Sequence, residues 1–356
     1  MKIRARTGFR FLLAVLGATV SLGLLSTAFF RWNLSGDGPT LTPRFEVGTF
    51  LRQIPENLPW LLPFAVLSAA VIPLRALQWQ RALATPVTFR ERYHLVAIGA
   101  FVHNLIPGKL GELTRAFLLS RTQSLPLVRS LGSVAVCKLL EFAALMLVLS
   151  AAVLLSDSEA IRPFLGKLKI AAVVCLVLTS LVVALARFSG RLSQLLVRSE
   201  RTAGLGRSLA HLGEGLGTAR SVRGMGRLLL MSLPPVVAPA LAYGIGLEAI
   251  GIQGGIWAGP VVLGAIAVGQ APGLPAGMGI FYFLVSWVAR SLGAAEEAAA
   301  AYAALTHLTS VVTLIAVGAV SVWMRKLRWR DLRRGSALAQ KALQRVDAPV
   351  ASVLKI

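Results

Sequence analysis

Long apolar runs separated by short polar stretches make up most of this chain. Six of the runs approach the roughly 20 residues that a helix needs to cross a bilayer. They cover residues 9–30, 58–80, 131–155, 168–186, 228–250 and 299–323. The first run follows a basic N-terminus but is longer than the apolar part of a signal peptide, so we assign it to a membrane helix. The pattern predicts an all-α polytopic membrane protein with about six full spans.

Two further apolar segments, 93–121 and 256–292, are interrupted by proline and glycine. In the first, Ile106 is followed by PGKLGELTR, and in the second, Gln270 is followed by APGLPAGMG. An unsatisfied backbone group is costly in hydrocarbon, so an interrupted helix persists only where protein surrounds it or a polar cavity adjoins it. We therefore predict two re-entrant helical hairpins, each made of two half-length pieces. Paired interruptions of this kind are typical of the substrate site in an inverted-repeat transporter.

Basic residues are concentrated between the apolar runs. The chain has 37 Lys and Arg against 15 Asp and Glu, a formal net charge of +22, and its mean hydropathy is +0.71. Basic clusters at the N-terminus, in 187–227 and in the tail 326–356 indicate cytoplasmic segments, because positive charge is retained on that side of the membrane. These segments should also attract the anionic lipids of the inner leaflet. Charge placed between membrane spans argues against a nucleic-acid partner.

The loop charges predict a topology in the inner, cytoplasmic membrane of the cell, with both termini in the cytoplasm. In this topology the two hairpins enter the membrane from opposite faces, as an inverted repeat requires. Residues 1–325 form one membrane domain, and residues 326–356 form a basic cytoplasmic tail. The basic cytoplasmic loop 187–227 is either an amphipathic helix on the inner leaflet or a solvated loop.

Charged and polar residues gather at the first interruption. The candidates for substrate binding here are Asn104, Pro107, Gly108, Lys109, Gly111, Glu112 and Arg115. Glu112 and Arg115 lie three residues apart, so both can face one side of a helix. The glycine turn opens a half-helix whose free N–H groups and positive dipole end suit a phosphate group, and Lys109 and Arg115 add positive charge. The alternative is an ion pair that only stabilises the hairpin.

Two other regions complete the candidate set. Lys138 and Glu141 lie three apart in the third full span, where they either join the same polar cluster or form a structural pair with a snorkelling lysine. At the second interruption the candidates are Gln270, Pro275, Gly277, Gly279 and Tyr282, with no charge before Arg290. For Tyr282 we favour a core or interfacial aromatic residue. Arg75 with Trp79 is interpreted as an anchor at the inner end of a span.

The motifs at these sites resemble those of one family. The segment 104–115, NLIPGKLGELTR, resembles the signature of the lysylphosphatidylglycerol synthase transmembrane family, whose members are flippase-like. The segment 133–141 is similar to a following part of that signature, although the family more often has Arg and Asp at its two charged positions. The segment 275–282 resembles a second family motif that ends in Glu, where this chain has Tyr282. The similarity extends over residues 10–325.

The resemblance implies a membrane domain that flips or binds lipids. The chain resembles the flippase-type domain alone, without the soluble aminoacyl-transfer domain of the multiple peptide resistance factor, so lipid aminoacylation is disfavoured. The tyrosine in place of the family glutamate points to a different substrate, such as a polyprenyl-linked sugar, a hopanoid or another glycolipid.

These features lead to one main hypothesis and two alternatives. The main hypothesis is an integral membrane lipid flippase or transporter, not an enzyme, that moves a polar headgroup through a cavity between the two broken hairpins. One alternative is a membrane-embedded enzyme on a lipid carrier, with Glu112 or Glu141 as acid or base; the other is a non-transporting anchor for a cytoplasmic enzyme. Membrane lipids are the expected partners, and a homo-oligomer or a partner lipid-synthesis enzyme stays open. The four histidines show no ligand spacing, and we expect no metal and no cofactor.

Overall fold

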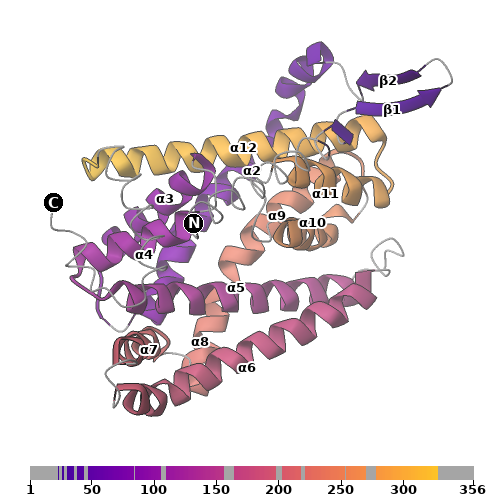
Figure 1. The fold of residues 1–356 in the computed structure, drawn as a ribbon. Helices are drawn as coiled ribbons and strands as arrows, with labels where there is room; N and C mark the ends of the chain where they lie inside the picture. Colours follow the sequence, from indigo (N-terminus) through magenta and orange to yellow (C-terminus); the bar gives the residue numbers. More distant parts are fainter. Residues whose placement is uncertain are drawn as a thin grey trace. The chain divides into compact units, whose positions relative to one another are not determined.

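The computed structural model is helical over nearly all of the chain that it describes. The described residues are 30–35, 38–43, 47–83, 85–105, 110–155, 164–197, 203–217, 221–252, 254–269 and 278–327, together with Gly23, Ser26 and Thr27. Within them the one sheet is an antiparallel hairpin of β1 (Phe30–Ser35) and β2 (Gly38–Pro43), which departs from the all-α prediction (Figure 1). The helical class is otherwise confirmed.

Eleven helices follow the hairpin in the described part of the chain. They are α2 (Val47–Ala82), α3 (Phe89–Leu105), α4 (Gly111–Thr122), α5 (Leu127–Leu155), α6 (Phe164–Val197), α7 (Ala203–Gly215), α8 (Val222–Ser232), α9 (Pro234–Ala249), α10 (Gly255–Gly269), α11 (Met278–Ser291) and α12 (Glu296–Met324). The basic loop 187–227 is therefore mainly helical where it is described, because it contains the end of α6, all of α7 and the start of α8.

Four stretches of helix are long and apolar enough to cross a membrane. They are Glu56–Ala82, Leu127–Leu155, Val222–Ala249 and Glu296–Met324. They coincide with four of the six predicted spans, which supports a multi-pass membrane protein. The predicted span 168–186 lies inside α6, whereas the predicted span 9–30 and the tail 326–356 lie almost entirely outside the described residues.

Both predicted interruptions are present as pairs of short helices. The chain leaves α3 at Leu105 and enters α4 at Gly111, and it leaves α10 at Gly269 and enters α11 at Met278. At 1.5 Å per residue the four helices are about 26, 18, 22 and 21 Å long, less than the roughly 30 Å hydrocarbon core of a bilayer. The members of each pair pack against each other. Each predicted interruption therefore falls between two separate short helices.

Glycine allows the close approach of α3 and α4. A Cβ atom on Gly99 would lie 3.0 Å from the carbonyl oxygen of Gly111, and one on Gly111 would overlap the carbonyl oxygen of Gly99 and lie 2.7 Å from Cβ of His103. Backbone atoms cannot move aside as a flexible side chain can. The two helices can therefore pair at this distance only with glycine at position 111.

Replacing Gly111 should separate this pair of helices. We expect Gly111→Val to destabilise the protein by about 1–3 kcal/mol or more, as overpacking in a tight interior does. Thermal unfolding in detergent measures the effect. Gly190→Ala is the matched control, because an added Cβ at this α6 position meets nothing within 4 Å. Equal unfolding temperatures for the two variants would contradict the close pairing of α3 and α4.

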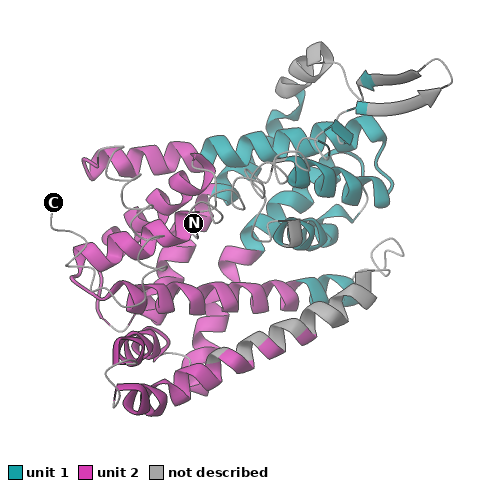
Figure 2. Cartoon of the chain, in the orientation of Figure 1, with its two compact units in different colours: residues 1–68, 149–165, 237–313 teal, residues 69–148, 166–236, 314–356 magenta. Residues whose placement is uncertain are grey.

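The chain divides into two compact units, which we describe separately. Unit 1 comprises 1–68, 149–165 and 237–313, and unit 2 comprises 69–148, 166–236 and 314–356 (Figure 2). The unit boundaries fall inside α2, α5, α6, α9 and α12. Unit 2 thus contains the first interrupted pair, α3–α4, and unit 1 contains the second, α10–α11.

Each unit has its own apolar core. In unit 1, Trp60, Phe64 and Tyr243 are buried around Tyr302, whose hydroxyl donates a hydrogen bond to the carbonyl oxygen of Tyr243 at 2.7 Å. In unit 2 the core includes the largest fully buried side chain, Trp79 of α2, together with apolar side chains of α3, α4 and α5. The unit 2 core supports the charged residues described next.

Candidate functional site

Five charged side chains of unit 2 form one continuous chain of ion pairs. Arg115 Nε lies 2.6 Å from Glu112 Oε2, and Glu112 Oε1 lies 2.8 Å from Lys138 Nζ. The same Nζ lies 2.9 Å from Glu141 Oε2, which is in turn 3.1 Å from Nη2 of Arg75. Cations and carboxylates therefore alternate along the chain, with a cation at each end. We call these five residues the charged network.

Three helices contribute to the charged network. Glu112 and Arg115 are three residues apart on α4, and Lys138 and Glu141 are three apart on α5, so each pair shares one helix face as predicted. The structure also joins the two pairs, which the sequence left open. Arg75 of α2 completes the network, where the sequence analysis expected only a membrane anchor. Nothing in the local sequence of α2 could have identified its partner, which is 66 residues away.

The charged network is partly exposed and carries an excess of positive charge. The side chains of Arg115 and Glu141 are 3% and 9% exposed, whereas those of Arg75, Glu112 and Lys138 are 30%, 34% and 35% exposed. Three cations and two carboxylates leave a net charge of +1. Removing charges from water is costly, so a fully buried structural cluster would need its charges to balance. The network is instead accessible and favours an anion.

Several atoms of the network are left without a hydrogen bond. Within the described part of the chain, Arg75 Nε, Arg115 Nη2 and Glu141 Oε1 are buried and have no hydrogen-bond partner. A buried donor or acceptor of this kind is costly unless it finds a partner. The network therefore has hydrogen-bonding capacity beyond its internal ion pairs.

A second group of residues holds Arg115 in position. Its guanidinium carbon lies 5.1 Å from the ring centroid of Trp79, in the range of a cation–π contact. The Trp79 indole is fully buried, and its Nε1 donates to Ser133 Oγ at 3.1 Å. The Ser133 hydroxyl donates to the carbonyl oxygen of Ser130 at 2.7 Å. Arg115 therefore rests on a ring that is itself fixed by α5.

The helix that carries Glu112 begins beside the network. Leu110 is the N-cap of α4 and provides no side-chain hydrogen bond to the helix end. The positive end of the helix dipole lies at this terminus, so it adds to the positive potential around Glu112. The adjoining candidates Pro107, Gly108 and Lys109 lie outside the described residues.

Asn104 is not part of the charged network. Its Nδ2 donates to the carbonyl oxygen of Ala100, one turn earlier in α3, at 2.8 Å. Gly111 contributes by its lack of a side chain, as the contact with Gly99 shows. Of the candidates at the first interruption that the structure describes, Glu112 and Arg115 are thus the two charged members of the site.

The second interruption is only partly described. Gln270, Pro275 and Gly277 lie outside the described residues, and Gly279 lies in the first turn of α11. The ring of Tyr282 is 5.9 Å from that of Phe281 and 5.0 Å from that of His307 of α12. Tyr282 thus belongs to an aromatic cluster. His307 was not expected as its neighbour from the sequence.

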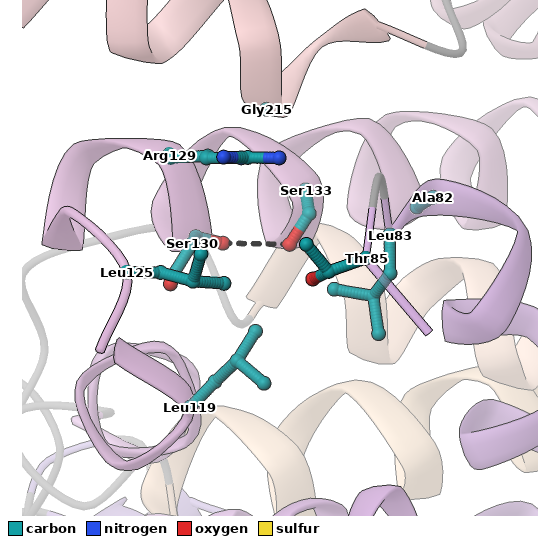
Figure 3. A pocket seen from close by; sticks show the side chains of 9 residues that line it. All are labelled: Ala82, Leu83, Thr85, Leu119, Leu125, Arg129, Ser130, Ser133 and Gly215. Atoms are coloured by element: carbon teal, nitrogen blue, oxygen red, sulfur yellow. Dashed lines mark hydrogen bonds between the residues drawn. The ribbon is translucent and has the colours of Figure 1, made fainter. Parts of the chain in front are cut away.

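Ser130 and Ser133 also line a small pocket in unit 2. Figure 3 shows its lining residues, which are Ala82, Leu83, Thr85, Leu119, Leu125, Arg129, Ser130, Ser133 and Gly215. The pocket has room for about one water molecule, so it cannot hold a headgroup. Arg129 is also paired with Glu214 of α7, at 3.4 Å. The charged network is therefore the stronger candidate in unit 2.

Among the described residues, no group of three His, Cys, Asp or Glu side chains could hold a metal ion.

Comparison with known families gives a match over most of the chain. The family model for the lysylphosphatidylglycerol synthase TM region matches residues 15–318. The chain belongs to this family. The resemblance of its motifs is thus confirmed over most of its length, and all five residues of the charged network lie within the part that matches the lysylphosphatidylglycerol synthase TM region. Neither the curated proteins nor the solved structures give a match to the chain.

Proposed function

We propose that this protein is a lipid translocator that moves the polar headgroup of a phospholipid, glycolipid or polyprenyl- or hopanoid-type lipid across the membrane. The headgroup passes the charged network while the lipid tails stay in the bilayer. We further propose that α3–α4 and α10–α11 are re-entrant and opposed, as in an inverted-repeat transporter. The basic segments favour the inner membrane of the cell, with both termini in the cytoplasm.

The accessible excess charge of the network carries this proposal. A lipid phosphate brings at least one negative charge, which the net +1 of the network would balance. Arg75 and Lys138 are the cations that a phosphate can reach, because their side chains are 30% and 35% exposed. Arg115 is 3% exposed and acts through its ion pair with Glu112. Glu112 and Glu141 each lie between two cations and pair with both. The two carboxylates can also accept a hydrogen bond from a hydroxyl or an amine of the headgroup.

The proposal does not include a chemical change of the lipid. A carboxylate that acts as acid or base needs to exchange a proton with its substrate. Glu112 and Glu141 are each shared between two cations, which keeps them in the charged form. Movement is then driven by an existing gradient or by equilibration between the leaflets.

Reconstitution of the purified protein tests the proposal. We expect proteoliposomes to move labelled phospholipids with a phosphate-bearing headgroup between leaflets at least tenfold faster than protein-free liposomes prepared in parallel. Mass spectrometry of the recovered lipid should show an unchanged mass. A changed lipid mass would favour an enzyme, and movement no faster than in the protein-free liposomes for every headgroup would remove the translocator proposal.

A further inference from the structure

A histidine lies in the middle of the last long apolar helix. His307 is twelve residues into the 29-residue α12, so it is about 17 Å from the start of the helix. Its side chain is half-buried, and within the described residues neither ring nitrogen has a hydrogen-bond partner. A polar group at this depth of a membrane span is costly, and such groups mark functional positions. His307 belongs to unit 1 and takes no part in the charged network.

Two aromatic side chains of α11 face His307. The ring centroid of His307 is 4.5 Å from that of Phe281 and 5.0 Å from that of Tyr282. The rings are tilted relative to each other by 52° and 57°, so the histidine is not stacked flat against either ring. Phe281 is buried and Tyr282 is half-buried. Phe281 and Tyr282 lie within the first two turns of α11, directly after the second interruption.

The cluster offers hydrogen bonds without charge. A neutral imidazole has one donor and one acceptor, and a phenol hydroxyl can act as both. The charged residues of α11 and of the start of α12 are Arg290, Glu296 and Glu297, and all three lie two or more turns away along their helices. Arg290 and Glu296 pair with each other at 3.8 Å. Along the described parts of α11 and α12 a charged group would find no countercharge beside the cluster, whereas a hydroxyl group could both donate and accept. The half-buried rings of Tyr282 and His307 add an apolar surface against which the C–H groups of a sugar or polyol can pack.

We propose that His307, Phe281 and Tyr282 form a second binding site, which takes the hydroxyl-bearing part of a lipid headgroup, such as a sugar or a polyol. The site selects lipids with an uncharged, hydroxylated group. The inference deepens the proposed function by naming this substrate class and rests on it for the transport step, although binding can be measured without transport.

Binding of three short-chain lipids to the full chain in nanodiscs tests the site. The lipids are phosphatidylglycerol, which has both phosphate and hydroxyls; phosphatidic acid, which has the phosphate alone; and glucosyldiacylglycerol, which has hydroxyls alone. We expect His307→Phe to weaken binding of phosphatidylglycerol and of glucosyldiacylglycerol by about 3- to 10-fold, the value of one neutral hydrogen bond. Binding of phosphatidic acid should change by less than twofold.

Two further variants separate hydrogen bonding from packing. His307→Gln keeps a donor and an acceptor, so it should retain most of the affinity that His307→Phe loses. Leu308→Phe is the matched control, because this neighbouring residue of α12 is 50% exposed and lies outside the cluster. Equal weakening of all three lipids, or no change for any lipid, would overturn the site. If no lipid is translocated but His307-dependent binding of the glycolipid persists, the translocator proposal fails and the binding site stands.

Discussion

Glu112→Gln should reduce lipid translocation at least tenfold. Glu112 bridges Arg115 and Lys138, so its loss leaves two cations side by side and raises the net charge of the network from +1 to +2. Arg115, which is 3% exposed, would lose its ion-pair partner, and an unpaired buried group costs about 1–3 kcal/mol. A headgroup would then be held by uncompensated cations or would meet a rearranged site. Initial rates of lipid movement in proteoliposomes measure the effect.

Two variants make this result specific to the charged network. Glu214→Gln removes a carboxylate of α7 that is 47% exposed and is paired with Arg129 of α5. This variant should leave the rate within twofold of wild type, because exposed ion pairs contribute little. The double variant Glu112→Gln/Lys138→Gln restores the net charge of +1 and should recover part of the thermal stability that Glu112→Gln loses. Equal rates for wild type and Glu112→Gln would show that headgroups do not pass this network.

The parts of this protein that follow from local pattern were predictable. The interruptions after Leu105 and Gly269 are encoded by proline and glycine within apolar runs, and the four long apolar helices follow from run length alone. The pairing of Glu112 with Arg115, and of Lys138 with Glu141, follows from the three-residue spacing on a helix. None of these features depends on how distant segments meet.

The parts that depend on distant contacts were not predictable from one sequence. Arg75 looked like a residue at the end of a span, because its partner Glu141 is 66 positions away on another helix. His307 had no metal-ligand spacing, and its neighbours Phe281 and Tyr282 become apparent only when α11 packs on α12. The β1–β2 hairpin was missed because two six-residue strands give little periodic signal beside long apolar runs.

The same Arg→Lys change should affect the translocation rate differently at the two ends of the network. At position 115 a planar guanidinium is buried against Trp79 and paired with Glu112, and an ammonium group cannot reproduce the stacking and the fork of donors together. At position 75 the guanidinium is 30% exposed and pairs with Glu141 through one nitrogen, which a lysine can imitate.

We therefore expect Arg115→Lys to lower the translocation rate about tenfold, while Arg75→Lys keeps it within about twofold. The net charge of the network is +1 in both variants, so a difference between them cannot arise from charge alone. It would show that the network depends on the orientation of Arg115, which Trp79 and Ser133 fix and which positions Glu112. Equal rates for the two variants would mean that only the total charge matters, and the buried support behind Arg115 would then serve stability.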